Sequence, residues 1–292
     1  MADKRSVKSV EVGDNGGSDG PAILVASNGT ARGACAFEAA ARLAEIKNGW
    51  VITERIFDFP EGGGDSADAL ERVAAEAREL FKGQGRCLVE VDKLSESYTD
   101  ENYGRAMMLA DAATRHDAKL IVIGVHGQKK SANALSATMT QKLMKVAPCP
   151  VLIVSRHDSG DYRKVMVAVD FSDCSLTCIK EAMRFAPQAE YDLVHVGDDA
   201  AAAESELRQL VAQARDALQG QLETVPGEDA FRVEIGQGKP TDVIADAAAE
   251  HRPDLMVMGT RGRSGLAKLV LGSVASRFIA APPCDLLVLR NR

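Results

Sequence analysis

Short apolar runs alternate with amphipathic stretches along most of the chain. In the second half, five apolar or β-branched runs have the length of buried strands. They lie at 164–169, 191–196, 231–235, 255–259 and 286–289. Between them, apolar side chains recur every three or four residues, which predicts amphipathic helices. These helices are expected at 174–186, 204–219, 241–251 and 273–281, with Pro240 opening the third.

The first half shows the same order of elements. Its strand-like runs lie at 22–26, 50–57, 86–91, 120–124 and 151–154. Strict alternation of strands and helices is typical of a parallel sheet whose two faces are both covered, and right-handed crossovers favour double winding. We therefore predict an α/β fold with two tandem doubly wound parallel five-stranded sheets, each flanked by helices.

Two ungapped blocks of the chain repeat. Residues 23–44 align with 165–186 at an offset of 142, and residues 119–156 align with 254–291 at an offset of 135. Besides the apolar positions, the glycines and the Pro-Cys pair coincide, which chance similarity of apolar runs does not explain. Gly124, Gly127, Pro148 and Cys149 recur as Gly259, Gly262, Pro283 and Cys284.

The repeat predicts two domains joined by a short linker. The first is expected over 21–156 and the second over 164–292, with the polar, glycine-containing segment 157–163 as the linker. Residues 1–20 are polar and rich in Gly, Ser and Asp, so we expect a disordered tail there.

Composition narrows the class of partner. The net charge of −7 does not favour nucleic acid or an anionic membrane surface as a partner. The longest apolar runs are far shorter than a membrane span, and the N-terminus shows no signal-peptide pattern. Six cysteines without disulfide-like clustering fit a reducing compartment. We therefore expect a cytoplasmic protein that binds neither nucleic acid nor membrane.

The segment GTRGRSGLAKLVLGS, residues 259–273, has the composition of an anion site. Ligands of open parallel sheets bind at the carboxyl ends of strands, where the strand order reverses, and this segment follows the fourth strand of its half. Its glycines allow close backbone approach, and Ser273 is expected to cap a helix whose amino end attracts phosphate. By themselves these residues also fit an ordinary loop before a capped helix. Neither GxxxxGK[ST] nor a Rossmann GxGxxG occurs at a first strand.

The spacing Gly259-x2-Gly262-x9-Gly272-Ser273 resembles the signature of the universal stress protein family. VAVDFS after the first strand of the second half, GKP before its third helix and the terminal PCDLLVL are similar to that family too. The resemblance covers both halves. It implies the strand order 3-2-1-4-5, ATP binding where the full signature is kept, and pairing of domains through their fifth strands.

The resemblance also implies a set of binding residues. Asp170 matches an acidic residue near the ribose and phosphates, where Mg²⁺ bound to ATP would reach it, and Val196 matches a position that meets adenine. The full set implied for ATP is Ala168, Val169, Asp170, Val196, Gly238, Gly259, Arg261, Gly262, Gly272, Ser273 and Val274. No catalytic residue and no protein-held metal is expected.

The first half departs from this pattern. Asn28 stands at the position of Asp170, His126 at that of Arg261, and Ala137-Thr138 at that of Gly272-Ser273. A Cβ atom at Ala137 would hinder close approach of phosphate and would disfavour positive φ. We therefore predict that the first domain has a degenerate site, which binds ATP weakly or not at all.

Other candidate groups are weaker. EGGGDS, residues 61–66, is interpreted as a loop that supplies Asp65 or Ser66 as a helix cap. Cys174 and Cys178 lie on one helix face without further ligands at zinc-like spacing. The five histidines are scattered, and His195 is expected to be packed and hydrogen-bonded rather than to touch a ligand.

These observations favour an ATP-binding regulator of a stress response over a turnover enzyme. ATP would order residues 263–271, and a protein partner would recognise the ordered surface. Two alternatives stay open: slow ATP hydrolysis or self-phosphorylation, with Asp170 holding Mg²⁺ and Ser273 as acceptor, and a nucleotide-independent scaffold. Edge strands that can pair further predict a homodimer.

Overall fold

The computed structural model divides the chain into two compact units, Met1–His157 and Asp158–Arg292. Each unit is a layered α/β structure with one sheet between helices, which confirms the predicted fold class. The residues described are 7–13, 20–26, 31–57, 66–81, 86–94, 99–125, 133–155, 161–260 and 271–290.

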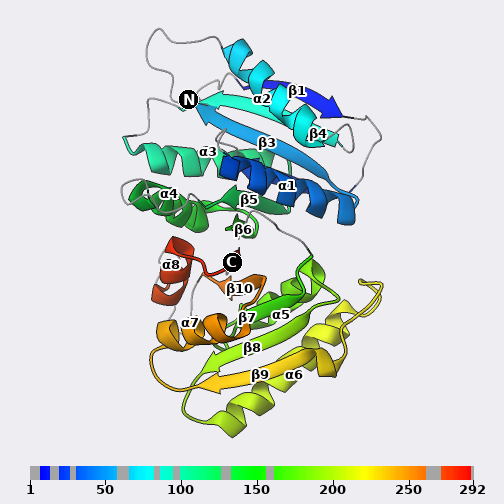
Figure 1. Ribbon diagram of the computed structural model, residues 1–292, viewed down its shortest axis with the longest axis vertical. Helices are drawn as coiled ribbons and strands as arrows, with labels where there is room; N and C mark the ends of the chain where they lie inside the picture. Colours follow the sequence, from blue (N-terminus) through cyan, green and yellow to red (C-terminus); the bar gives the residue numbers. More distant parts are fainter. Residues whose placement is uncertain are drawn as a thin grey trace. The chain divides into compact units, whose positions relative to one another are not determined.

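The second unit contains five parallel strands in the order β11-β10-β7-β8-β9 (Figure 1). Its core strands are apolar runs with almost no exposure, because helices cover both faces of the sheet. The elements in chain order are β7 (Lys164–Ala168), α5 (Ser175–Phe185), β8 (Glu190–Val196), α6 (Ala200–Leu218), a 3₁₀ turn (Glu228–Ala230), β9 (Phe231–Gly236), α7 (Pro240–His251), β10 (Leu255–Gly259), α8 (Ser273–Ala280) and β11 (Asp285–Leu289).

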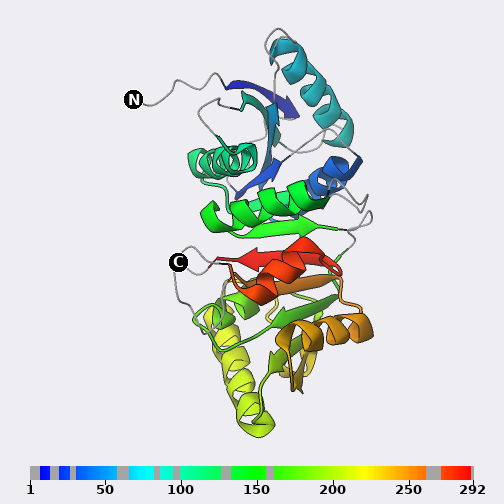
Figure 2. The same ribbon diagram turned by 90° about the vertical axis from the view of Figure 1, so that its left-hand side faces the viewer.

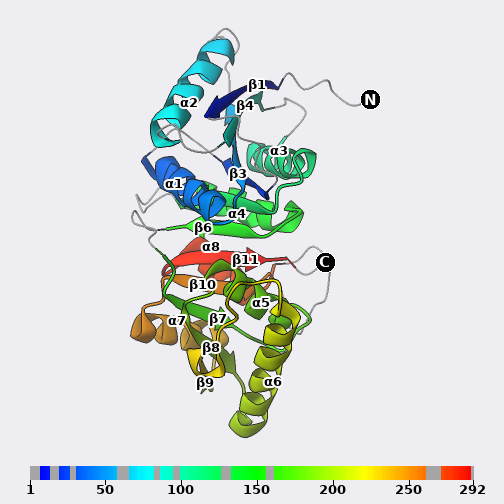
Figure 3. The ribbon, with the colours of Figure 1, turned by 90° about the vertical axis from the view of Figure 1, so that its right-hand side faces the viewer.

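Helices α5 and α6 cover one face of this sheet, and α7 and α8 cover the other (Figures 2 and 3). The strand order reverses between β7 and β10, so the loops after these two strands diverge to opposite faces. The crevice that this divergence creates is the place where open α/β sheets bind ligands.

Over its described residues, the first unit has six strands in the order β1-β4-β3-β2-β5-β6. Five of them are parallel and correspond to the predicted sheet. The elements are β1 (Lys8–Gly13), β2 (Ala22–Ala26), α1 (Ala31–Ile46), β3 (Trp50–Phe57), α2 (Ser66–Phe81), β4 (Arg86–Lys93), α3 (Glu101–Arg115), β5 (Leu120–Gly124), α4 (Asn133–Val146) and β6 (Val151–Val154).

The additional strand β1 corrects two expectations. The tail predicted over 1–20 contains Lys8–Gly13, which pairs antiparallel with β4, so this sheet is not five-stranded. Lys8, Val10 and Val12 alternate with more exposed residues, and Val12 is buried where β1 packs against α2. Three inward positions are enough to hold a strand on an existing sheet edge.

The predicted linker 157–163 ends in packed residues. The Tyr162 side chain is buried, and its hydroxyl donates to Asp285 Oδ2 at 3.0 Å. Asp254 Oδ2 accepts hydrogen bonds from the backbone amides of Arg163 and Lys164, both at 3.0 Å. The start of β7 is therefore fixed by side chains from the far end of its own unit.

None of the described helices is both long and apolar enough to cross a membrane.

Candidate functional site

A pocket of about 250 Å³ opens at the carboxyl ends of β7, β8 and β10 in the second unit. It lies beside α7 and the first turn of α8, at the reversal of strand order. Eight of the eleven predicted binding residues line it: Ala168, Val169, Asp170, Val196, Gly259, Gly272, Ser273 and Val274. The fold thus brings together residues that are more than a hundred positions apart in sequence, and their role as ligand contacts stays a prediction.

The other three predicted residues are placed differently. Gly238 is not among the residues that line the pocket, although its φ of +115° gives it a backbone conformation that only glycine adopts readily. Arg261 and Gly262 lie outside the described residues.

Asp170 is held in one orientation by the turn that follows β7. Its Oδ1 atom accepts a hydrogen bond from the Ser172 amide at 3.0 Å and another from Ser175 Oγ at 3.2 Å. The Oδ2 atom of Asp170 accepts no hydrogen bond from the described residues. A half-buried carboxylate with one oxygen committed to the turn can present the other to a cation or a hydroxyl in the pocket.

Phe171, next to Asp170, has a left-handed backbone conformation with φ 57°. For a bulky residue this costs on the order of 1–3 kcal/mol, and it persists where neighbouring contacts enforce it. The Phe171 ring lies 4.3 Å from the His195 ring, centroid to centroid, and His195 Nδ1 donates to the Val169 carbonyl at 2.8 Å. His195 is therefore packed and hydrogen-bonded, as predicted, and its two contacts are with the residues on either side of Asp170.

The two ends of the segment after β10 meet at one point. The Thr260 amide donates to the Leu289 carbonyl at 2.8 Å, and the Gly272 amide donates to the Thr260 carbonyl at 2.9 Å. The chain therefore leaves and re-enters the pocket wall at the same place. What lies between, 261–270, is outside the described residues.

The start of α8 corrects two expectations about the glycine–serine pair. Gly272, not Ser273, is the N-cap, and Ser273 is the first helical residue. Gly272 has φ −63° and ψ 152°, a backbone conformation that any residue can adopt. Glycine is therefore suited to this position by its lack of a Cβ atom and not by a positive φ. No side chain caps α8, which leaves amide donors of its first turn to solvent or a ligand.

Apolar side chains make up much of the remaining lining. Val194, Ile244 and Met258 line the pocket with Val196, and Pro240 at the first position of α7 lines it as well. Six lining residues were not expected from the sequence: Val194, Pro240, Ile244, Met258, Thr260 and Ala275. The GKP motif at 238–240 was the available signal, because it places the start of α7 at this edge of the sheet.

The cysteine pair near this loop is buried. Cys174 and Cys178 face each other with 3.8 Å between their sulfur atoms, and contact with Cys174 together with burial raises the pKa of Cys178. No group of three or more metal-ligating side chains is found in the described part of the chain.

The model of the universal stress protein family matches residues 21–155 and again 161–290. The chain belongs to the universal stress protein family. A universal stress protein of Methanocaldococcus jannaschii is 30% identical over 154 residues, covering 47% of this chain and 88% of that one. One of Mycobacterium tuberculosis is 28% identical over 191 residues, covering 60% of this chain and 62% of that one.

Solved structures agree in fold over nearly the whole tandem chain. A universal stress protein from Archaeoglobus fulgidus has a TM-score of 0.65 at 17% identity and covers 92% of this chain and 96% of its own. At 17% sequence identity, this similarity shows only that the two proteins share the same fold.

The two units of this universal stress protein differ where the pocket forms. The residues Asn28 and His126, which replace Asp170 and Arg261, lie outside the described residues. Ala137, the counterpart of Gly272, falls inside α4, which begins at Asn133, whereas Gly272 precedes its helix. The extended backbone of Gly272 therefore has no counterpart in the first unit.

Proposed function

We propose that this chain binds ATP in the pocket of its second unit and acts as a nucleotide-dependent regulator of a stress response rather than as a turnover enzyme. One observation carries the proposal. Eight residues that the family resemblance implies for ATP converge on a single pocket with an apolar side and an uncapped helix end.

The residues present fit an adenine nucleotide. A base can lie against Val194, Val196 and Ile244, since this part of the pocket is apolar. The phosphates then reach the amides at the start of α8, where the helix dipole and free N–H groups favour anions. Asp170 would hold the ribose or a Mg²⁺ ion bound to the phosphates.

The regulatory step proposed is that ATP orders residues 263–271 for recognition by a partner protein. All of these residues except Leu271 lie outside the described ones. Support comes from the hydrogen bond between Gly272 and Thr260, because it anchors both ends of the segment at the pocket wall. A ligand at that wall would thus contact the segment where it begins and ends.

One observation favours a second candidate, self-phosphorylation. Ser273 is exposed and lines the pocket, so its hydroxyl is open to a nucleotide. Mass spectrometry of the protein after incubation with Mg²⁺ and ATP tests this, with Ser273→Ala as the variant. A phosphate on Ser273 that accumulates with time would move the chain from the binding to the enzymatic class.

Identification of the copurifying ligand tests the proposed function. The protein is purified, denatured in acid, and the released small molecules are separated by chromatography. We expect an adenine nucleotide from the wild type and none from Gly272→Val, in which a branched side chain meets the phosphate position. Absence of nucleotide from the wild type, together with no binding on titration with ATP, would favour a scaffold.

Assembly and location stay predictions. Pairing of the two domains through β6 and β11, association of two chains and a cytoplasmic location follow from the edge-strand and composition arguments alone. Light scattering on the eluted protein measures the number of chains directly.

A further inference from the structure

Glu54 in the first unit stands at the position of Val194 in the second. Strands β2 and β7 correspond at the offset of 142, and β3 pairs with β2 in the same register as β8 pairs with β7. Strands β4 and β9 continue the match, so that Glu90 corresponds to Glu234. Val194 lines the ATP pocket proposed above, and its counterpart is a glutamate.

The third helices of the units correspond as well. A residue in the left-handed region follows each helix: Asp117, with φ 49°, comes two residues after the end of α3, and Arg252, with φ 50°, comes directly after α7. These residues are 135 positions apart, which is the offset of the second repeat block. Arg115 therefore corresponds to Glu250.

One ion-pair position is common to both units. His116 Nε2 lies 3.0 Å from Glu90 Oε1, and His251 Nε2 lies 2.6 Å from Glu234 Oε2. Both units therefore share this Glu–His pair, and the residues at the positions of Val194 and Glu250 beside it differ between them.

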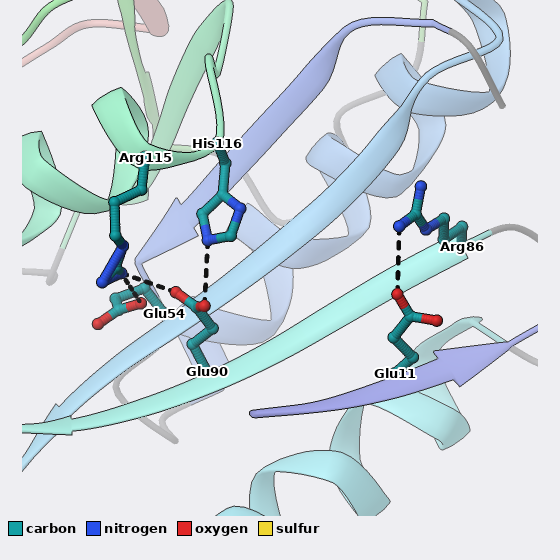
Figure 4. Close-up of polar contacts among 6 residues, drawn as sticks. All are labelled: Glu11, Glu54, Arg86, Glu90, Arg115 and His116. Carbon is teal, nitrogen blue, oxygen red and sulfur yellow. Dashed lines mark hydrogen bonds and ion pairs between the residues drawn. The ribbon is translucent and has the colours of Figure 1, made fainter. Parts of the chain in front are cut away.

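In the first unit these two positions complete a polar network, in which Glu54 and Glu90 are buried and the Arg115 side chain is 37% exposed (Figure 4). Arg115 Nη2 lies 2.8 Å from Glu90 Oε2 and 3.7 Å from Glu54 Oε2. Glu54 is 1% exposed, and neither of its carboxyl oxygens has a hydrogen bond among the described residues. Burial and the neighbouring Glu90 raise its pKa to about 9. A valine methyl surface is thus replaced by a longer polar group.

The helices at the same edge are extended in the first unit. Helix α3 begins at Glu101, four residues before Arg105, the counterpart of Pro240 at the start of α7. Helix α4 also begins several residues before the counterpart of Ser273. Both helices therefore have additional residues at their amino ends compared with α7 and α8.

We propose that the residue at the position of Val194 decides which unit accepts the base of the nucleotide. Valine leaves an apolar floor in the second unit, whereas Glu54 with its Arg115 and Glu90 partners fills that floor with polar atoms in the first. Each chain consequently binds one nucleotide. This inference rests on the proposed function, because it assigns the specificity of the same site.

The test transplants the network into the second unit. Glu234 and His251 are already present there, so Val194→Glu with Glu250→Arg supplies the two missing members and gives the new carboxyl a partner. The full chain and its variants are titrated with ATP by calorimetry, and circular dichroism melting checks that each is folded. Val194→Glu alone, the double variant, Val194→Ile and Glu54→Val are compared with the wild type.

We expect one ATP per wild-type chain, a loss of affinity of at least about tenfold in Val194→Glu and in the double variant, and a change within about threefold in Val194→Ile. Glu54→Val should leave the affinity at the second unit unchanged. A folded double variant that keeps wild-type affinity overturns the inference alone, as do two equal sites in the wild type. A wild type that binds no ATP overturns the proposed function together with the inference.

Discussion

At the scale of single residues, Glu54 makes stability depend on pH. Its pKa is about 9 in the folded chain against an ordinary value of 4.5, so the folded state keeps a proton that the unfolded chain releases. The contribution of Glu54 to the free energy of unfolding should therefore be fully present below about pH 4.5. It should fall as the pH rises towards 9, by at most about 1.4 kcal/mol per pH unit.

The variant Glu54→Gln removes this proton linkage. We expect it to flatten the pH dependence of unfolding between pH 5 and about 9 and to be more stable than the wild type at the alkaline end. Trp50, the single tryptophan of the chain, lies in β3 beside this network and reports on unfolding of the first unit. Glu71→Gln, at an exposed side chain, is the matched control. Equal pH profiles for wild type and Glu54→Gln would contradict the account.

Asp170 should contribute to ATP binding through its charge and to stability through the hydrogen bonds that it accepts in the turn after β7. Asp170→Asn can keep an oxygen acceptor for Ser172 and Ser175 but loses the charge, whereas Asp170→Ala loses both. We expect Asp170→Asn to lose the part of the ATP affinity that depends on Mg²⁺ while keeping its stability. Asp170→Ala should in addition lose about 1–2 kcal/mol of stability. Titrations with Mg²⁺ and with a chelator measure the first effect, and an unchanged Mg²⁺ dependence in Asp170→Asn would rule it out.

Residue types and spacing indicated part of the pocket. The glycine–serine signature and Asp170 could be named because they lie in loops at predictable strand ends. Ile244 and Met258 could not be named in advance, because they lie inside a helix and a strand. Their sequence positions indicate burial but not which buried residues face the pocket. The cap at Ser273 was wrong by one position, as the extended backbone before α8 belongs to Gly272.

At the scale of elements, β1 supplies a prediction of its own. Val12 is 5% exposed against α2, whereas Ser9 on the same strand is exposed. Val12→Asp should destabilise the first unit by about 2 kcal/mol or more, because it buries an unpaired charge, and Ser9→Asp should change stability by no more than about 0.5 kcal/mol. Urea unfolding followed by Trp50 fluorescence compares them. Equal effects of the two variants would mean that β1 does not pack in solution.

Periodicity predicted the elements that repeat. In the described part of the chain, the parallel strands of both units are built on short apolar or β-branched runs, which is why their positions could be read from the sequence. Charged residues interrupt these runs in β3, β4, β8 and β9. Strand β1 has only two valines in a polar segment, and its burial depends on α2, which lies far along the chain.

At the scale of the whole molecule, duplication of one α/β unit has been followed by divergence at the pocket edge. The second unit keeps an apolar floor, an oriented aspartate and an uncapped helix start. The first has the buried carboxyls of Glu54 and Glu90 at the corresponding floor, with Arg115 beside them. The sequence alone predicted this asymmetry from loop residues, whereas Glu54 is in a strand, where its correspondence to Val194 follows only from the strand pairing.

The location of ATP in crystals of the full chain soaked with excess Mg²⁺ and ATP tests the central claim most directly. We predict electron density for one nucleotide, in the second unit beside Asp170 and Gly272, and none at the corresponding edge of the first. A nucleotide bound at full occupancy in the first unit, or bound in the second unit away from this pocket, would contradict the account.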